Sequence, residues 1–167
     1  MDFGWFLFGF HGRINRAKYW LALAIYLILG AVFMMLFLGD MQKFIILEHH
    51  LSDDIRLSAF IPFFVIGVPM IVVGAWIFTA TTVKRLHDRG KSGLWMVPFY
   101  VVPAILEKAA DRTQDVNVMF VAALIALVLT VWGFVETYCL KGTPGTNRFG
   151  PDPLSPQKRI GGLMVHR

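Results

Sequence analysis

Long uncharged runs dominate the chain. Three of them, Tyr19 to Gly39, Leu57 to Val83 and Val116 to Val135, contain no Asp, Glu, Lys or Arg. The hydrocarbon core of a bilayer is about 30 Å thick, and a helix crosses it with about 20 apolar residues. Each of the three runs is therefore long enough to predict a membrane-spanning helix.

A fourth apolar run is shorter. Gly93 to Leu106 would be roughly 21 Å long as a helix, and it contains Pro98 and Pro103. By length it fits a re-entrant or interfacial segment as well as a short span. If the helix continues past Glu107 and Lys108 toward Ala110, it becomes a short span.

The distribution of basic residues decides between these alternatives. With four spans the loops alternate sides, and one side holds twelve of the sixteen Lys and Arg residues: Arg13, Arg16, Lys18, Lys84, Arg85, Arg89, Lys91, Lys141, Arg148, Lys158, Arg159 and Arg167. Basic loops are retained in the cytoplasm. A re-entrant third segment would place the basic tail outside, so we predict four spans with both termini cytoplasmic.

The resulting expectation is an all-α integral membrane protein with helices at about residues 19–39, 57–83, 93–110 and 116–138. Residues 1–18 would be a cytoplasmic or interfacial segment, because the aromatic residues 1–10 are too few to span and favour the headgroup region. Residues 19–140 would form the membrane domain. Residues 141–167 would be a cytoplasmic tail, irregular and partly mobile because it is rich in Gly and Pro.

Composition supports a membrane protein. Hydrophobic residues make up 56% of the chain and charged residues 16%, with a mean hydropathy of +0.60, whereas soluble domains are about 45–50% apolar and about 25% charged. The net charge of +5 follows from the basic cytoplasmic loops, so we expect no nucleic-acid partner. The first apolar run is longer than a signal-peptide core, which predicts an uncleaved anchor.

Candidate chemistry outside the basic loops is sparse. The loop holding Glu48, His49, His50, Asp53 and Asp54 offers metal-ligand types, but their spacing fits no standard motif, and we interpret it as a solvated acidic loop with no metal or cofactor. No ionisable residue lies in the middle of a span, which argues against a proton-coupled transporter. There is no catalytic constellation, so an enzyme is not favoured.

Three motifs share the predicted cytoplasmic side. They are Phe8-Gly9-Phe10-His11-Gly12-Arg13-Ile14-Asn15-Arg16-Ala17-Lys18-Tyr19-Trp20, Lys84-Arg85-Leu86-His87-Asp88-Arg89-Gly90-Lys91-Ser92-Gly93-Leu94-Trp95 and Gly142-Thr143-Pro144-Gly145-Thr146-Asn147-Arg148-Phe149-Gly150-Pro151-Asp152-Pro153. In this order they resemble the domain of unknown function 805 family, small YhaH-like bacterial inner-membrane proteins. The resemblance covers nearly the whole chain. It implies a helical fold in the bacterial inner membrane and no particular activity.

The motifs leave two interpretations open for a site. Arg85 and Asp88 are three apart and share a helical face, while His87 points elsewhere. Asp88 could pair with Arg13 or Arg16 in a structural clasp. The alternative is a cradle for an anionic group, and the candidates for either role are Arg13, Arg16, Arg85, His87, Asp88, Lys91, Asn147 and Arg148, with Trp20 and Trp95 as interfacial aromatics. Gly90 should end the second helix, and Ser92 is placed to cap the third.

For function, the sequence favours a small inner-membrane protein that binds a partner protein or anionic lipid at its cytoplasmic rim. Contact with membrane lipids is expected, and a homo-oligomer is possible. Two alternatives are an oligomeric transporter or channel component, and a membrane enzyme that acts on a lipid phosphate with His87 as acid or base and Arg85 on the phosphate.

Overall fold

The computed structural model describes residues 2–47, 63–113, 115–155, 159–160 and 163–164. The chain divides into two compact units, which are treated separately: one contains residues 21–79, and the other contains residues 1–20 and 80–167. The acidic loop of residues 48–54, with its histidine pair, lies outside the described residues.

Among the described residues, four helical segments are long and apolar enough to span a membrane: Arg16–Met35, Phe64–Asp88, Gly93–Ala110 and Val116–Cys139. The predictions of an all-helical spanning region and of four spans are thereby confirmed at the level of length and composition. The third span also ends at the predicted residue, Ala110.

The first helix extends beyond its predicted bounds at both ends. Helix α2 covers Arg16–Leu47, whereas the sequence suggested about 19–39. It begins early because the Asn15 side chain accepts a hydrogen bond from the Lys18 N–H at 2.9 Å, as a helix cap does. It continues past Gly39 to Leu47, and none of residues 40–47 is Gly or Pro. The end of the uncharged run was therefore wrong as a helix boundary.

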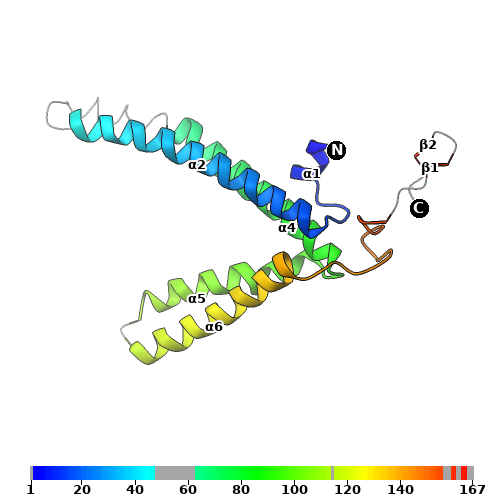
Figure 1. Cartoon of the computed structure of the whole chain (residues 1–167). Helices are drawn as coiled ribbons and strands as arrows, with labels where there is room; N and C mark the ends of the chain where they lie inside the picture. Colours follow the sequence, from blue (N-terminus) through cyan, green and yellow to red (C-terminus); the bar gives the residue numbers. More distant parts are fainter. Residues whose placement is uncertain (1, 48–62, 114, 156–158, 161–162, 165–167) are drawn as a thin grey trace. The chain divides into compact units, whose positions relative to one another are not determined.

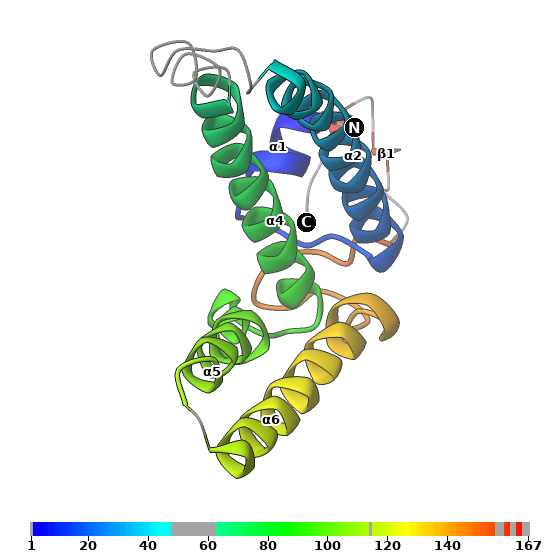
Figure 2. The ribbon, with the colours of Figure 1, turned by 90° about the vertical axis from the view of Figure 1, so that its left-hand side faces the viewer.

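In the unit of residues 21–79, α2 lies beside α4 (Figures 1 and 2). Helix α4 covers Val68–Asp88 and follows a π-helical turn, η2, at Phe63–Gly67. This wider turn precedes Pro69, whose missing N–H removes an α-helical hydrogen bond. Tyr26 of α2 packs closely on α4 at Gly74. A Cβ added to this glycine would lie 3.2 Å from the Tyr26 ring.

The third span consists of three consecutive segments: η3 at Gly93–Trp95, η4 at Val97–Val101 and α5 at Val102–Ala110. Pro98 and Pro103 lie in the first turn of η4 and of α5, where the fixed φ of proline is compatible with a helix. Both prolines are thus accommodated within a span. Ser92 occupies the N-cap position of η3, but its side chain makes no capping hydrogen bond, which corrects the predicted role.

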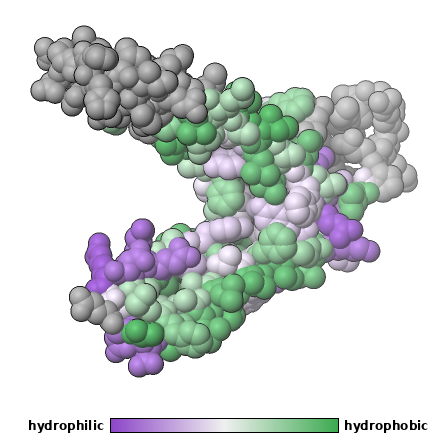
Figure 3. All heavy atoms as spheres, turned by 60° about the vertical axis from the view of Figure 1, so that its left-hand side comes forward, coloured by the Kyte–Doolittle hydropathy of each residue, from purple (hydrophilic) through white to green (hydrophobic). Residues whose placement is uncertain are grey.

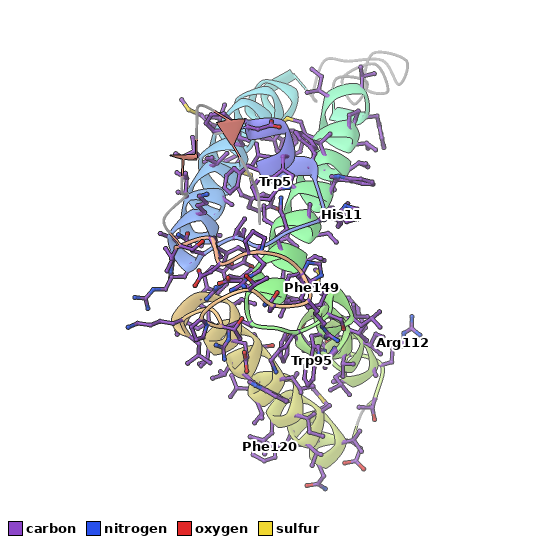
Figure 4. All side chains as sticks on the ribbon, turned by 90° about the vertical axis from the view of Figure 1, so that its right-hand side faces the viewer. Trp5, His11, Trp95, Arg112, Phe120 and Phe149 are labelled. Carbon is purple, nitrogen blue, oxygen red and sulfur yellow. The ribbon has the colours of Figure 1, made fainter. Side chains whose placement is uncertain are left out.

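The fourth span comprises α6, Val116–Phe134, and a π-helical end, η5, at Val135–Cys139. It packs along α5 (Figures 1 and 2), and Phe99 lies against Gly133 at this contact. Hydrophobic residues cover much of this helix pair, and hydrophilic residues gather at its tip (Figure 3). Arg112 at that tip extends away from the ribbon (Figure 4). Such apolar helix surfaces are suited to lipid contact.

The two ends of the chain carry shorter elements. Helix α1 covers Phe3–Phe8, where the sequence suggested an interfacial segment without naming a helix. Near the other end, β1 at Arg159–Ile160 pairs antiparallel with β2 at Leu163–Met164. The segment between η5 and β1 is largely irregular, as far as the structure describes it.

Candidate functional site: a buried ion cluster at the end of the spans

The last turn of α4 positions the central residues of the site. Arg85 and Asp88 share one face of this turn, and Gly90 ends it with a φ of 71°. The Lys91 N–H donates to the Leu86 carbonyl and the Gly90 N–H to the His87 carbonyl, each at 2.9 Å. This is the Schellman pattern, in which glycine takes the left-handed position. The predicted helix end at Gly90 is confirmed.

Asp88 binds two arginines inside the protein. Arg13 donates from Nε at 3.1 Å and from Nη2 at 3.0 Å to Asp88 Oδ1, and Arg85 donates from Nη1 to Oδ2. The side chains of Arg13, Asp88 and Arg85 are 1%, 3% and 0% exposed. Because charges are costly to bury singly, each member of this trio depends on the others. Of the two arginines that the sequence offered to Asp88, the structure pairs Arg13.

The remaining donors of Arg13 hold the tail. Nη2 donates to the Thr143 carbonyl at 2.6 Å, and Nη1 donates to the carbonyls of Gly145 at 2.6 Å and Gly150 at 3.3 Å. The backbone N–H of Thr143 also donates to the Asp88 carbonyl at 2.8 Å. One guanidinium thus joins three segments that are distant in sequence.

Five consecutive backbone carbonyls at the end of η5 each accept a side-chain hydrogen bond. The donors are Arg85 to Thr137 and Leu140, Trp20 to Tyr138, Arg16 to Cys139, and Arg89 to Lys141. The last carbonyls of a helix have no helical partner and carry its negative dipole end. Four of these five bonds come from arginine side chains, whose charge the carbonyls stabilise, and the fifth comes from the Trp20 indole.

A second carboxylate, Glu136, binds the loop between the second and third spans. Arg89 Nε lies 3.1 Å from Oε2, and Lys91 Nζ lies 3.4 Å from Oε1. Lys91 Nζ also stands 4.0 Å from the ring centre of Trp95 and 5.7 Å from that of Trp132. Both distances fit cation–π contacts, so Lys91 is engaged within the protein.

His87 is held in place on two sides. Its Nδ1 lies 3.2 Å from the Gly12 carbonyl, which makes Nδ1 the donor, and its ring stacks on Phe149 with centres 3.9 Å apart. Asn147 donates from Nδ2 to the His87 carbonyl at 2.9 Å. The guanidinium of Arg148 also lies over the Phe149 ring, 4.6 Å from the ring centre. Figure 4 labels Phe149 at the end of α4.

The tail also carries a carboxylate at the surface. Asp152 accepts hydrogen bonds from the N–H groups of Leu154, at 2.9 Å, and Gly145, at 3.1 Å. These bonds favour the charged form, so they hold the pKa of Asp152 below its ordinary value. Asp152 therefore stays ionised and keeps the tail turn closed at neutral pH.

The structure brings most of the predicted residues into one neighbourhood but gives them different environments. Arg13, Arg85 and Asp88 are buried, whereas Arg16 and Arg148 are exposed. Sequence reasoning missed Lys84, which is fully buried although a lysine at a helix end usually lies in water. It also missed Thr143 and Glu136 as partners. In the described part of the chain, no group of three or more His, Cys, Asp or Glu residues could hold a metal.

The described part of the chain contains four apolar helices of membrane-spanning length and a charged cluster, which together define a multi-pass α-helical membrane protein. The chain belongs to the DUF805 family, proteins of unknown function, whose pattern matches residues 7–151. The resemblance seen in the three motifs is thereby confirmed.

Relatives from Escherichia coli strain K12 agree with this assignment. The chain is 29% identical over 146 residues to the uncharacterized protein YiiR and to the inner membrane protein YhaI, covering 87% of this chain and 86% of each relative. It is 28% identical over 145 residues to the inner membrane protein YhaH, covering 87% of both chains. No solved structure matches. The chain is thus a multi-pass inner-membrane protein of a family without an established activity.

Proposed function

We propose that this inner-membrane protein binds anionic phospholipid headgroups at its cytoplasmic face through Arg16, Lys141 and Arg148. The observation that carries the proposal is the division of the basic residues into two sets. Arg13 and Arg85 are buried and bonded to Asp88 and to backbone carbonyls. The three exposed cations have no ion pair among the described residues.

The exposed cations keep donors for a ligand. Arg16 gives one hydrogen bond to the Cys139 carbonyl, and Arg148 gives one to the Gly90 carbonyl at 3.3 Å. Each guanidinium has five N–H donors, and its planar shape suits two phosphate oxygens at once. Stacking on Phe149 orients Arg148 further. These features support phosphate binding at the surface of the buried cluster.

The cytoplasmic side is inferred from charge. Twelve of the sixteen basic residues fall on the side that holds the ion cluster if the four helices span in turn. The anionic inner leaflet attracts such residues with about 1 kcal/mol each. Both termini would accordingly lie in the cytoplasm.

Of the alternatives, the lipid-phosphate enzyme loses its main support. It requires Arg85 to hold the substrate phosphate, but Arg85 is fully buried and donates to Thr137, Asp88 and Leu140. A binding role needs only the exposed residues, so it fits the geometry better.

The test compares lipid retention by the purified protein in native mass spectrometry with added cardiolipin or phosphatidylglycerol. The double variant Arg16→Gln/Arg148→Gln should lose retained lipid, by about fivefold for each residue if each contributes about 1 kcal/mol. The matched control is Lys158→Gln/Arg159→Gln, which removes the same charge from the far tail. We expect the control to retain lipid within about twofold of the wild type, because salt screens the diffuse attraction between the tail charges and the lipid.

Equal losses in the two double variants would contradict a headgroup site, because they would reduce the effect to net charge. Unchanged retention in Arg16→Gln/Arg148→Gln would also contradict it, and would direct attention to a protein partner for the same surface.

A further inference from the structure

The N-terminal helix α1 is apolar on its outer face as well as its inner face. Phe6 is fully buried, whereas Phe3 is 59% exposed and Phe8 46% exposed. Asp2 caps the helix, and its side chain accepts a hydrogen bond from the Trp5 N–H at 3.2 Å. It contains no charged residue. A helix with aromatic residues on the outside is poorly suited to water.

Lys84 fastens this helix to the end of α4. Its ammonium donates to the carbonyls of Trp5 and Phe6, both at 2.7 Å, and lies 4.8 Å from the Trp5 ring centre. Lys84 is fully buried, and none of the described carboxylates pairs with it. The carbonyls at the end of a helix carry its negative dipole end, so they stabilise the buried charge.

The segment that joins α1 to the first span is short and folded against it. Only residues 9–15 separate α1 from α2, and the Trp5 indole donates to the His11 carbonyl at 3.1 Å. Trp5 and His11 are labelled on this part of the chain in Figure 4. Because the first span begins at Arg16, α1 cannot be far from the membrane surface. Exposed Phe and Trp residues favour that headgroup region.

From these contacts we infer that α1 is a second membrane-binding element, which lies in the interface of the leaflet with Phe3 and Phe8 inserted and is docked to the transmembrane domain by Lys84. The partner is the lipid surface itself, without selection of a headgroup. Lys84 would then transmit the position of α1 at the membrane surface to the end of α4, where the ion cluster lies.

The experiment places a spin label in the full chain, reconstituted into phosphatidylcholine vesicles. All labelled variants carry Cys139→Ser, which removes the native thiol. This substitution keeps the backbone carbonyl of residue 139 that accepts a hydrogen bond from Arg16. The label at Phe3→Cys is compared with Thr146→Cys in the exposed tail and with Leu127→Cys on α6. We expect the Phe3 label to be more accessible to oxygen than to a water-soluble nickel complex, at a depth between those of the two reference labels. The same accessibilities as at position 146 would overturn the interfacial placement.

A second variant tests the docking residue. Lys84→Met removes the ammonium group while keeping a long side chain, and Lys108→Met is the control at a lysine whose side chain is 82% exposed. We expect the Phe3 label to become more mobile, with narrower spectral lines, in Lys84→Met only. An unchanged spectrum in Lys84→Met would refute docking by Lys84. If Lys84→Met does not fold, Phe8→Ser tests insertion at a side chain that is 46% exposed. A Phe3 label that stays at its depth in this variant would overturn the proposal. Because the vesicles contain no anionic lipid, failure here is distinguishable from failure of headgroup binding.

Discussion

Replacing Asp88 by alanine should destabilise the protein strongly. The substitution leaves two buried guanidinium groups, those of Arg13 and Arg85, without their carboxylate. Breaking a buried ion pair from one side costs about 3–5 kcal/mol, and here one side chain serves two partners. We therefore expect the free energy of unfolding to fall by an amount at the upper end of this range, about 5 kcal/mol. Part of this loss is offset where the freed arginine donors reach neighbouring carbonyls.

The matched control is Asp111→Ala. Asp111 also pairs with a basic residue three positions earlier, Lys108, at 3.6 Å, but the two side chains are 82% and 68% exposed for Lys108 and Asp111. Exposed pairs contribute about 0–1 kcal/mol. Comparing the variants separates burial from sequence spacing, because both pairs have the same spacing along a helix.

Thermal unfolding of the two variants in mild detergent provides the measurement. For a chain of this size, about 1 kcal/mol shifts the melting temperature by about 2–4 °C. Asp88→Ala should therefore melt about 10–20 °C below the wild type, and Asp111→Ala within about 4 °C of it. Equal and small shifts would refute the view that Asp88 is the centre of a structural cluster.

Two further predictions concern packing and orientation. Gly142→Ala should lower the melting temperature, because a Cβ there would stand 2.1 Å from Asp88 Oδ2. Gly30→Ala should not lower it, because a Cβ at that position would have nothing within 4 Å. Equal effects in the two variants would contradict the close approach of the tail to Asp88. Reporter fusions after Asp111 should report the outside and fusions after Arg167 the cytoplasm. An external report after Arg167 would reverse the inferred orientation.

Much of the fold could be predicted because its causes are local. The spans follow from uncharged runs of bilayer length, and the end of α4 follows from the conformational freedom of Gly90. The extent of α2 could not be read in this way, because a helix continues beyond an apolar run until a residue interrupts it. Asp40 ends the charge-free run without ending the helix.

The site was predictable in membership and not in arrangement. Arg13 and Arg16 are equivalent in a linear reading, and only the path of residues 9–15 decides which one reaches Asp88. Burial of Lys84 could not be foreseen either, since its partners are backbone carbonyls of α1. Carbonyls have no sequence signature, so a residue that binds them looks like any other basic residue.

Charge balance explains why the cluster suits the end of a helical bundle. Arg13, Lys84 and Arg85 are buried together, and Asp88 is the carboxylate that touches two of them. The rest of the compensation comes from carbonyls at the ends of α1 and η5, which carry partial negative charge because their helices stop there. The basic residues in these loops are therefore suited to close the helix ends beside them. This arrangement explains why the strongest motif of the chain lies in basic connections and why Arg85 is buried inside the protein.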